Sequence, residues 1–351
     1  MAYLPQVRGA ILEEVLLYLL RRAGYRTIDL AGSDPTLQAG GAGLEVLGRG
    51  HRHQIDAIAD YIVAQPFAHP QRLLLEAKFY KKPIGIEVAR NAIGVLKDVS
   101  EFWVTRHGAP GTRPHRRYHY QYALFSASGY TKPAQSYAFA QDVYLIELQD
   151  NWAVRPILDA IQQLSVRDLD PRGQHGRVQI GIGEVREAVR RRLRGSALDL
   201  QVPNPDALEE IVRRCLQLDG ALLGMINGQF PVFLVPFAPL DELFRTFARP
   251  FAVEIPVQIR FNDEAWFLDA EDGRRLFAFD LPPALFEMYA RSGQLGAPDA
   301  LNLKQEMMSR IDATLMPPGG EGLPVFVRFT LDQNWLSEVR ERTRGSLPSE
   351  E

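Results

Sequence analysis

Cysteine is almost absent from this chain of 351 residues, which contains a single one, Cys215. One cysteine excludes an intrachain disulfide and a zinc site built on several cysteines, and it suits a reducing, cytoplasmic location. Long apolar runs are lacking as well, because Arg8, Glu13 and Arg21 interrupt the N-terminal apolar segment. We therefore expect neither a signal peptide nor a helix that crosses a membrane.

Sequence motifs for nucleotide binding are missing too. The chain contains no Walker A motif, so ATP-driven translocation is not expected. Gly181-Ile182-Gly183 lacks the third glycine of a dinucleotide-binding fingerprint. With 46% hydrophobic residues, the chain is long enough to bury about two cores, so we expect about two domains.

Acidic residues are absent from positions 102 to 141, where basic and aromatic residues are concentrated. The densest basic part is Arg113, Arg116 and Arg117. The interleaved aromatic residues include Tyr118, Tyr120 and Tyr122. Such a composition suits contact with the phosphate backbone of a nucleic acid, and a solvated basic loop is the alternative.

Two carboxylates and a lysine are predicted to meet at the edge of one sheet. The apolar run 72–75 indicates a buried strand that ends in Glu76-Ala77-Lys78, so Glu76 and Lys78 lie on the same face. A second predicted strand, residues 54–63, brings Asp56 beside Glu76 if the two strands form a hairpin. Buried charges require partners.

These three side chains suit a divalent metal site for phosphodiester hydrolysis. Asp56 and Glu76 would hold the cation, because hard divalent cations prefer carboxylate oxygens. The ammonium group of Lys78 would stabilise the nucleophilic water or the charge that develops on the phosphate. A structural salt-bridge network at the sheet edge is the alternative.

Helices alternate with strands over residues 1–150, which predicts an α/β domain with a mixed sheet flanked by helices. The first helix, at 7–23, is amphipathic. Residues 151–204 are predicted to form a helical connector, and its arginine-dense helix at 184–194 suits a solvated face, an interdomain contact or nucleic acid. Residues 205–345 predict a second α+β domain, for which recognition, sensing and oligomerisation are all open.

The order of these pieces resembles the PD-(D/E)xK nuclease superfamily, and within it the Mrr-like restriction endonucleases, over about residues 8–150. Glu13 lies on a helix similar to the first helix of that family, whose acidic residue faces the metal site. Ile55-Asp56 resembles the segment with the catalytic aspartate, and Glu76-Ala77-Lys78 resembles the second motif. His51-Arg52-His53 departs from the Gly-Asp-Gly-Gly run that relatives often have before that aspartate.

The resemblance implies a restriction-endonuclease-like fold and a DNA endonuclease that depends on Mg²⁺ or Mn²⁺, acting in defence against foreign DNA. It implies Glu13, Asp56 and Glu76 as metal ligands and Lys78 as the catalytic lysine; Glu14 is the alternative to Glu13. The expected DNA contacts are Arg113, Arg116, Arg117, His53 and Lys132.

Two other functions fit the same sequence: a structure-selective DNA repair nuclease, and a nuclease-like module that binds nucleic acid without activity. DNA is the expected partner and a membrane is not. A homo-oligomer and a partner protein from a defence operon are left open by the sequence.

Overall fold

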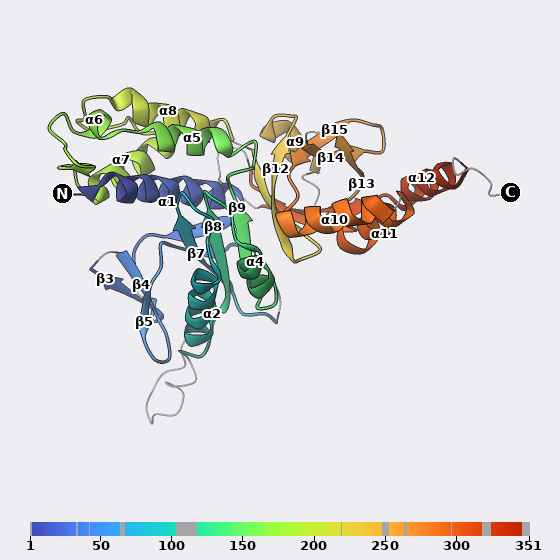
Figure 1. Cartoon of the computed structure of the whole chain (residues 1–351), viewed down its shortest axis with the longest axis horizontal. Coiled ribbons are helices and arrows are strands. Elements are labelled where there is room, and N and C mark those ends of the chain that lie inside the picture. Colours follow the sequence, from blue (N-terminus) through green and yellow to red (C-terminus); the bar gives the residue numbers. More distant parts are fainter. Residues whose placement is uncertain are drawn as a thin grey trace. The chain divides into compact units, whose positions relative to one another are not determined.

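The structure, a computed structural model, describes residues 2–32, 34–41, 43–63, 67–102, 118–218, 220–247, 253–262, 265–295, 297–317 and 324–345. The chain divides into two compact units, Met1–Asp219 and Gly220–Glu351, which run from blue to yellow-green and from yellow to red in Figure 1. The boundary differs from the predicted ones, because residues 151–204 belong to the first unit and do not form a separate connector.

A five-stranded sheet forms the centre of the first unit, in the order β2-β6-β7-β8-β9. Its strands are β2 (Tyr25–Ile28), β6 (Ala57–Tyr61), β7 (Gln71–Lys78), β8 (His119–Ser126) and β9 (Val143–Glu147). β2, β6 and β7 pair antiparallel, whereas β7, β8 and β9 pair parallel. The prediction of a mixed α/β fold is confirmed, and the predicted strands around Asp56 and Glu76 are neighbours.

The predicted strand 54–63 is interrupted at Asp56. β5 (Arg52–Gln54) ends before it and β6 begins after it, at Ala57. β5 belongs to a separate three-stranded antiparallel sheet with β3 (Leu37–Gly40) and β4 (Gly43–Leu47). Asp56 therefore lies where the chain passes from one sheet to the other.

Helix α1 (Leu4–Arg22) lies between the central sheet and a layer of later helices, as Figure 1 shows. The apolar face of this predicted amphipathic helix is buried, and Leu17 and Tyr18 are buried as well. The covering layer contains α5 (Arg155–Gln163), α6 (Val166–Leu169), α7 (Ile182–Leu193) and α8 (Pro205–Leu216). A short pair, β1 (Ala2–Tyr3) with β10 (Arg177–Val178), joins the start of the chain to this layer.

Two further helices pack against the parallel part of the sheet. α2 (Ile86–Ser100) contacts β8, and α4 (Lys132–Phe139) contacts β9 and α2. Their small residues Ala89, Ala92 and Ala134 are buried with Leu74 of β7 and other apolar side chains in one core. Small residues at a contact let helix and sheet approach closely, which fixes the strand ends that carry the candidate site.

The second unit is a closed barrel of seven strands, in the order β11-β12-β15-β14-β13-β17-β16. The strands are β11 (Leu222–Ile226), β12 (Phe230–Pro236), β13 (Val253–Asn262), β14 (Ala265–Ala270), β15 (Arg275–Phe279), β16 (Arg310–Leu315) and β17 (Val325–Leu331). The helices are α9 (Leu240–Phe247), α10 (Pro283–Leu295), α11 (Ala297–Met307) and α12 (Gln333–Gly345). The α+β composition agrees with the prediction, but the closed barrel was not foreseen.

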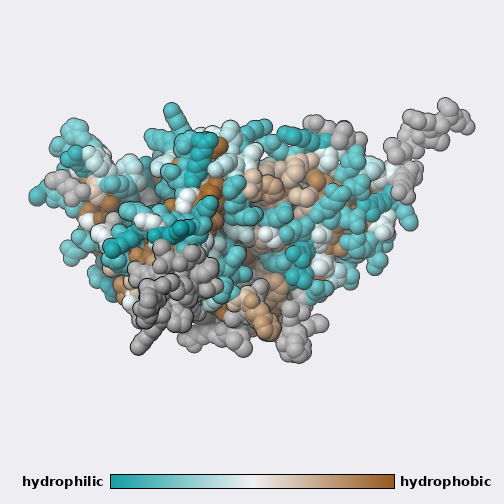
Figure 2. All heavy atoms as spheres, turned by 90° about the horizontal axis from the view of Figure 1, so that it is seen from below, coloured by the Kyte–Doolittle hydropathy of each residue, from teal (hydrophilic) through white to brown (hydrophobic). Residues whose placement is uncertain are grey.

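No helix within the described ranges is long and apolar enough to cross a membrane. On the face shown in Figure 2, hydrophilic residues predominate and apolar side chains emerge in separate patches.

Candidate active site

The candidate site forms where β7 ends. Leu73, Leu74 and Leu75 are buried, because β7 is an inner strand with β6 on one side and β8 on the other. The next charged side chains, Glu76 and Lys78, are 23% and 20% exposed, and Glu76 Oε1 lies 2.5 Å from Lys78 Nζ. The two-residue spacing places both groups on one face, as predicted.

The Asp56 side chain is hydrogen-bonded to the backbone of Ala77, the residue between Glu76 and Lys78. Its Oδ2 accepts a hydrogen bond from the Ala77 N–H at 2.9 Å. Burial raises the pKa of Asp56, and the Glu76 carboxylate adds to this shift, although the hydrogen bond from Ala77 and the charge of Lys78 oppose it. The two carboxylates are therefore electrostatic neighbours, as the hairpin prediction requires.

Lys78 is the positively charged member of this cluster. Burial disfavours the charged ammonium, but the attraction of Glu76 and Asp56 outweighs it and the pKa of Lys78 is raised. A lysine whose pKa is raised stays protonated at neutral pH, so it can donate hydrogen bonds and neutralise negative charge but cannot act as a base.

Tyr122 of β8 is a member of the site that the sequence did not predict. Its hydroxyl donates to Glu76 Oε2 at 2.8 Å, so both carboxylate oxygens of Glu76 have partners. The Tyr122 ring is buried, and the burial together with Glu76 raises its pKa. The interpretation of this tyrosine as a nucleic-acid contact is wrong, because the ring is enclosed in the sheet core.

Glu13 approaches the same cluster from α1. Its Oε2 pairs with Arg186 Nη2 of α7 at 3.0 Å. Burial raises the pKa of Glu13 to about 7; Arg186 opposes this shift, and the Asp56 and Glu14 charges reinforce it. The carboxylate of Glu13 therefore shares the electrostatic environment of Asp56 and Lys78.

The adjacent Glu14 also pairs with α7. Its side chain is almost fully enclosed and accepts from Arg186 Nε at 3.1 Å and from Arg190 Nη2 at 2.7 Å. Both glutamates thus bind α7 to α1, and the charge of Asp56 additionally raises the pKa of Glu13. The arginine-dense helix, which sequence reasoning left between three roles, contributes at least these two arginines to contacts within its own unit.

A cleft of about 290 Å³ opens beside Asp56. Its charged lining comprises Glu13, Asp29, Asp56, Arg186, Glu187 and Arg190. The cleft is therefore lined by carboxylates, which can bind a cation, and by arginines, which can bind phosphate.

Two of the three predicted metal ligands fit a Mg²⁺ ion. Asp56 and Glu76 offer neighbouring carboxylates, and Mg²⁺ commonly binds proteins through one or two carboxylates plus water and phosphate. Among the described residues, however, no three His, Cys, Asp or Glu side chains are grouped closely enough to hold a metal ion. Glu13 is paired with Arg186, so the trio is not a preassembled site and metal binding by it stays a prediction.

The predicted DNA contacts have three different outcomes. Arg113, Arg116 and Arg117 lie outside the described residues. His53 contacts Asp98 Oδ2 through Nε2 at 2.8 Å, and Asp98 also accepts from the backbone of residues 50 and 51. The His53 ring therefore shares Asp98 with the backbone of residues 50 and 51. Lys132 is exposed at the start of α4.

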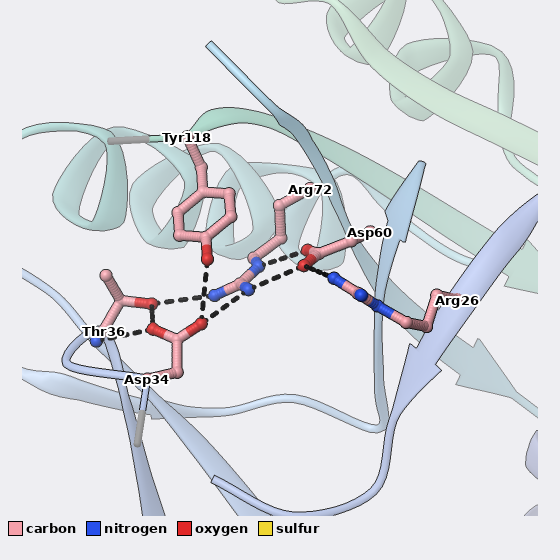
Figure 3. A network of polar contacts seen from close by, with 6 residues as sticks. All are labelled: Arg26, Asp34, Thr36, Asp60, Arg72 and Tyr118. Carbon is pink, nitrogen blue, oxygen red and sulfur yellow. Dashed lines mark hydrogen bonds and ion pairs between the residues drawn. The ribbon is translucent and has the colours of Figure 1, made fainter. Parts of the chain in front are cut away.

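A second charged cluster lies at the opposite end of β7, and Figure 3 shows it. The buried guanidinium group of Arg72 contacts Asp60 Oδ1 at 2.7 Å, Asp34 Oδ2 at 2.7 Å and Thr36 Oγ1 at 2.8 Å. The Tyr118 ring covers the guanidinium at 3.6 Å, and its hydroxyl donates to Asp34 at 2.9 Å. Tyr118 is thus a structural residue, which corrects its interpretation as a nucleic-acid contact.

No protein-family model and no curated protein matches the chain. A solved structure described as "Crystal Structure of Protein of Unknown Function AF1548" is similar over 60% of this chain and 98% of its own, with 15% sequence identity and a TM-score of 0.34. Function is therefore inferred from the residues of the site.

Proposed function

We propose that this chain is a metal-dependent DNA endonuclease whose restriction-endonuclease-like core lies in the first unit. The observation that carries the proposal is the end of β7, where Glu76 and Lys78 form an ion pair and Asp56 is hydrogen-bonded to the residue between them. A carboxylate pair next to a protonated lysine matches the requirements of phosphodiester hydrolysis.

Asp56 and Glu76 would hold Mg²⁺ or Mn²⁺, which when bound lowers the pKa of a coordinated water and neutralises phosphate charge. Lys78 remains protonated and donates toward the attacking water or toward the developing negative charge on the phosphate. Tyr122 holds the Glu76 carboxylate in orientation through its hydroxyl. The charge of Asp56 contributes to the raised pKa of Glu13, which is the candidate third ligand.

The role in defence against foreign DNA rests on the resemblance to Mrr-like restriction endonucleases. The mixed sheet flanked by helices agrees with the predicted fold class and does not bear on this role. A structure-selective repair nuclease uses the same chemistry, so the choice of substrate separates the two.

Plasmid cleavage tests the proposal. Purified protein is incubated with methylated and unmethylated plasmid in Mg²⁺, Mn²⁺ or EDTA, and nicked and linear products are measured. We expect cleavage with metal, none in EDTA, and none from Asp56→Asn, which keeps the shape of the side chain but removes the charge that binds a cation. The matched control is Asp159→Asn on the exposed side of α5, which should cut like the unaltered protein. Undiminished metal-dependent cutting by Asp56→Asn would refute the site.

A further inference from the structure

A basic groove begins immediately after the candidate catalytic lysine. The segment that follows Lys78 lines a cleft of about 540 Å³ together with the N-terminal part of α1 and the first turn of α2. Its polar lining is basic or neutral: Arg8, Tyr80, Lys81, Lys82 and Gln162. No acidic residue is among the described residues that line it, in contrast to the cleft beside Asp56.

The backbone of this groove is held firmly in place. The Ile84 N–H donates to the Gly129 carbonyl at 2.9 Å, and the Thr131 N–H donates to the Ile84 carbonyl at 3.0 Å. The Ser128 hydroxyl donates to the Lys82 carbonyl at 2.7 Å. Gly129 has φ +74°, a conformation that glycine adopts without strain. The segment is therefore a fixed platform that follows directly from β7.

The side chains on this platform are free to receive a ligand. Lys81 and Lys82 are exposed, and neither forms an ion pair with a carboxylate of the described residues. Tyr80 is 55% exposed, so much of its side chain is open to a ligand. Arg8 donates to the carbonyl oxygens of Gln162 and Leu164 at 2.6 and 2.7 Å, and these contacts hold the guanidinium without neutralising its charge.

We propose that this groove binds one strand of DNA next to the candidate catalytic site, with Lys81, Lys82 and Arg8 contacting phosphates and Tyr80 packing against a base or sugar. Exposed cations suit the phosphate backbone, and an exposed aromatic ring beside them suits a stacking contact. Phe79, the residue that follows Lys78, lines the groove, so the groove and the candidate catalytic lysine are adjacent in the chain. This inference rests on the proposed function, because DNA is the ligand that a DNA endonuclease requires.

DNA binding in EDTA, followed by fluorescence anisotropy over a series of salt concentrations, tests the groove apart from cleavage. The variant is Lys81→Gln with Lys82→Gln, and the charge-matched control is Lys97→Gln with Arg167→Gln, two exposed cations elsewhere in the first unit. With a single-stranded oligonucleotide as the probe, we expect the groove variant to bind about tenfold more weakly, and its salt slope to fall by about 0.7 for each lost phosphate contact. The control should bind like the unaltered protein.

Tyr80 is tested by Tyr80→Ala and Tyr80→Phe. Stacking needs the ring and not the hydroxyl, so the alanine variant should bind about tenfold more weakly and the phenylalanine variant should bind normally. Equal affinity and salt slope for the groove variant and its control would overturn the proposal, as would failure of the unaltered protein to bind DNA.

The outcomes separate the groove from the catalytic proposal. If the unaltered protein does not cleave DNA in any metal but the groove variant loses binding, the groove stands and the nuclease function fails. If the unaltered protein cleaves DNA and the groove variant binds and cleaves equally well, the groove fails and the nuclease function stands.

Discussion

Strand β7 carries a charged cluster at each end, and the two clusters differ in how deeply their charges are buried and in how their surroundings shift the pKa of the carboxylates. At its start, the guanidinium group of Arg72 is enclosed by Asp60, Asp34 and Thr36, with the Tyr118 ring above it. At its end, Glu76 and Lys78 remain about one-fifth exposed, and Glu13 and Asp56 are crowded against like charges.

The pKa values separate the clusters in the same way. Burial alone would raise the pKa of Asp34, but hydrogen bonds from Arg72 and Thr36 lower it to about 2. At the other end, burial prevails and the pKa of Glu13 rises to about 7. Carboxylates whose pKa is lowered by a paired cation stabilise a fold, whereas carboxylates whose pKa is raised by burial and by neighbouring carboxylates are typical of functional sites.

Arg72→Met should give the largest loss of stability. It leaves Asp34 without its cation and the buried Asp60 with only the exposed Arg26, and removing one partner of a buried pair costs about 3–5 kcal/mol. Urea unfolding of the first unit, followed by a probe within that unit, measures the loss. The control is Arg26→Gln, whose side chain is 68% exposed and 3.4 Å from Asp60; it should cost less than about 1 kcal/mol. Equal losses for the two variants would show that the Arg72 cluster is no more than a surface ion pair.

Lys78→Ala should affect turnover more than stability. Its ammonium acts where negative charge develops, and the loss of one such donor lowers turnover by about 10²–10³-fold. Single-turnover cleavage at saturating DNA measures the rate, and a metal titration shows whether affinity for Mg²⁺ is retained. An early thermal transition with unchanged turnover would instead assign Lys78 to a structural salt-bridge network.

Lys304 of the barrel unit extends the comparison to a buried cation that has no carboxylate partner among the described residues. Its Nζ donates to the Ile259 carbonyl at 2.9 Å and lies 5.4 Å from the Trp266 ring and 5.7 Å from the Trp335 ring. Burial, reinforced by the charge of Arg260, lowers its pKa from 10.5 to about 8.

This shift predicts how the stability of the barrel unit depends on pH. Between about pH 8 and 10.5 the unfolded chain binds the proton that the folded state has lost, so stability should rise with pH across this window. The rise should be on the order of 1–3 kcal/mol, measured as the difference from Lys304→Met at each pH. A flat difference across the window would contradict the lowered pKa.

Tyr122→Phe should give the smallest effect of the four. It removes the hydroxyl that donates to Glu76 and leaves the buried ring in place. The loss of one hydrogen bond to a charged group is worth about 1.5 kcal/mol, or about tenfold in rate if the bond orients Glu76 for catalysis. A rate equal to that of the unaltered protein would leave Tyr122 a purely structural role.

Local sequence patterns predicted the parts of the fold that depend on neighbours in the chain. The apolar stripe of α1 is buried, and the run before Glu76 is an inner strand. The same patterns could not show that later helices cover the other side of α1, because the partner of Glu14 is Arg190, which lies far along the chain. Nor could they close the barrel, whose parallel pair β13–β17 joins segments that lie far apart in sequence.

The candidate site was predictable to the extent that spacing determines it. Two residues of separation place Glu76 and Lys78 together, and the hairpin brings Asp56 to the same strand end. The interruption of the predicted strand at Asp56 was not predictable, because the hydrogen bond that the Asp56 side chain accepts comes from Ala77 in another strand. The tyrosines at 118 and 122 were misread because composition does not show that Tyr122 is buried in β8 or that the Tyr118 ring packs on Arg72.

The most direct test of the account compares Glu76→Gln with Arg72→Met, one change at each end of β7, by measuring both Mg²⁺-dependent plasmid cleavage and urea unfolding. We predict that Glu76→Gln loses cleavage and loses much less stability than Arg72→Met, because the Glu76–Lys78 pair is about one-fifth exposed, whereas Arg72→Met loses about 3–5 kcal/mol. If Glu76→Gln cleaves DNA at the rate of the unaltered protein, or if it is destabilised as much as Arg72→Met, the end of β7 is not the catalytic site.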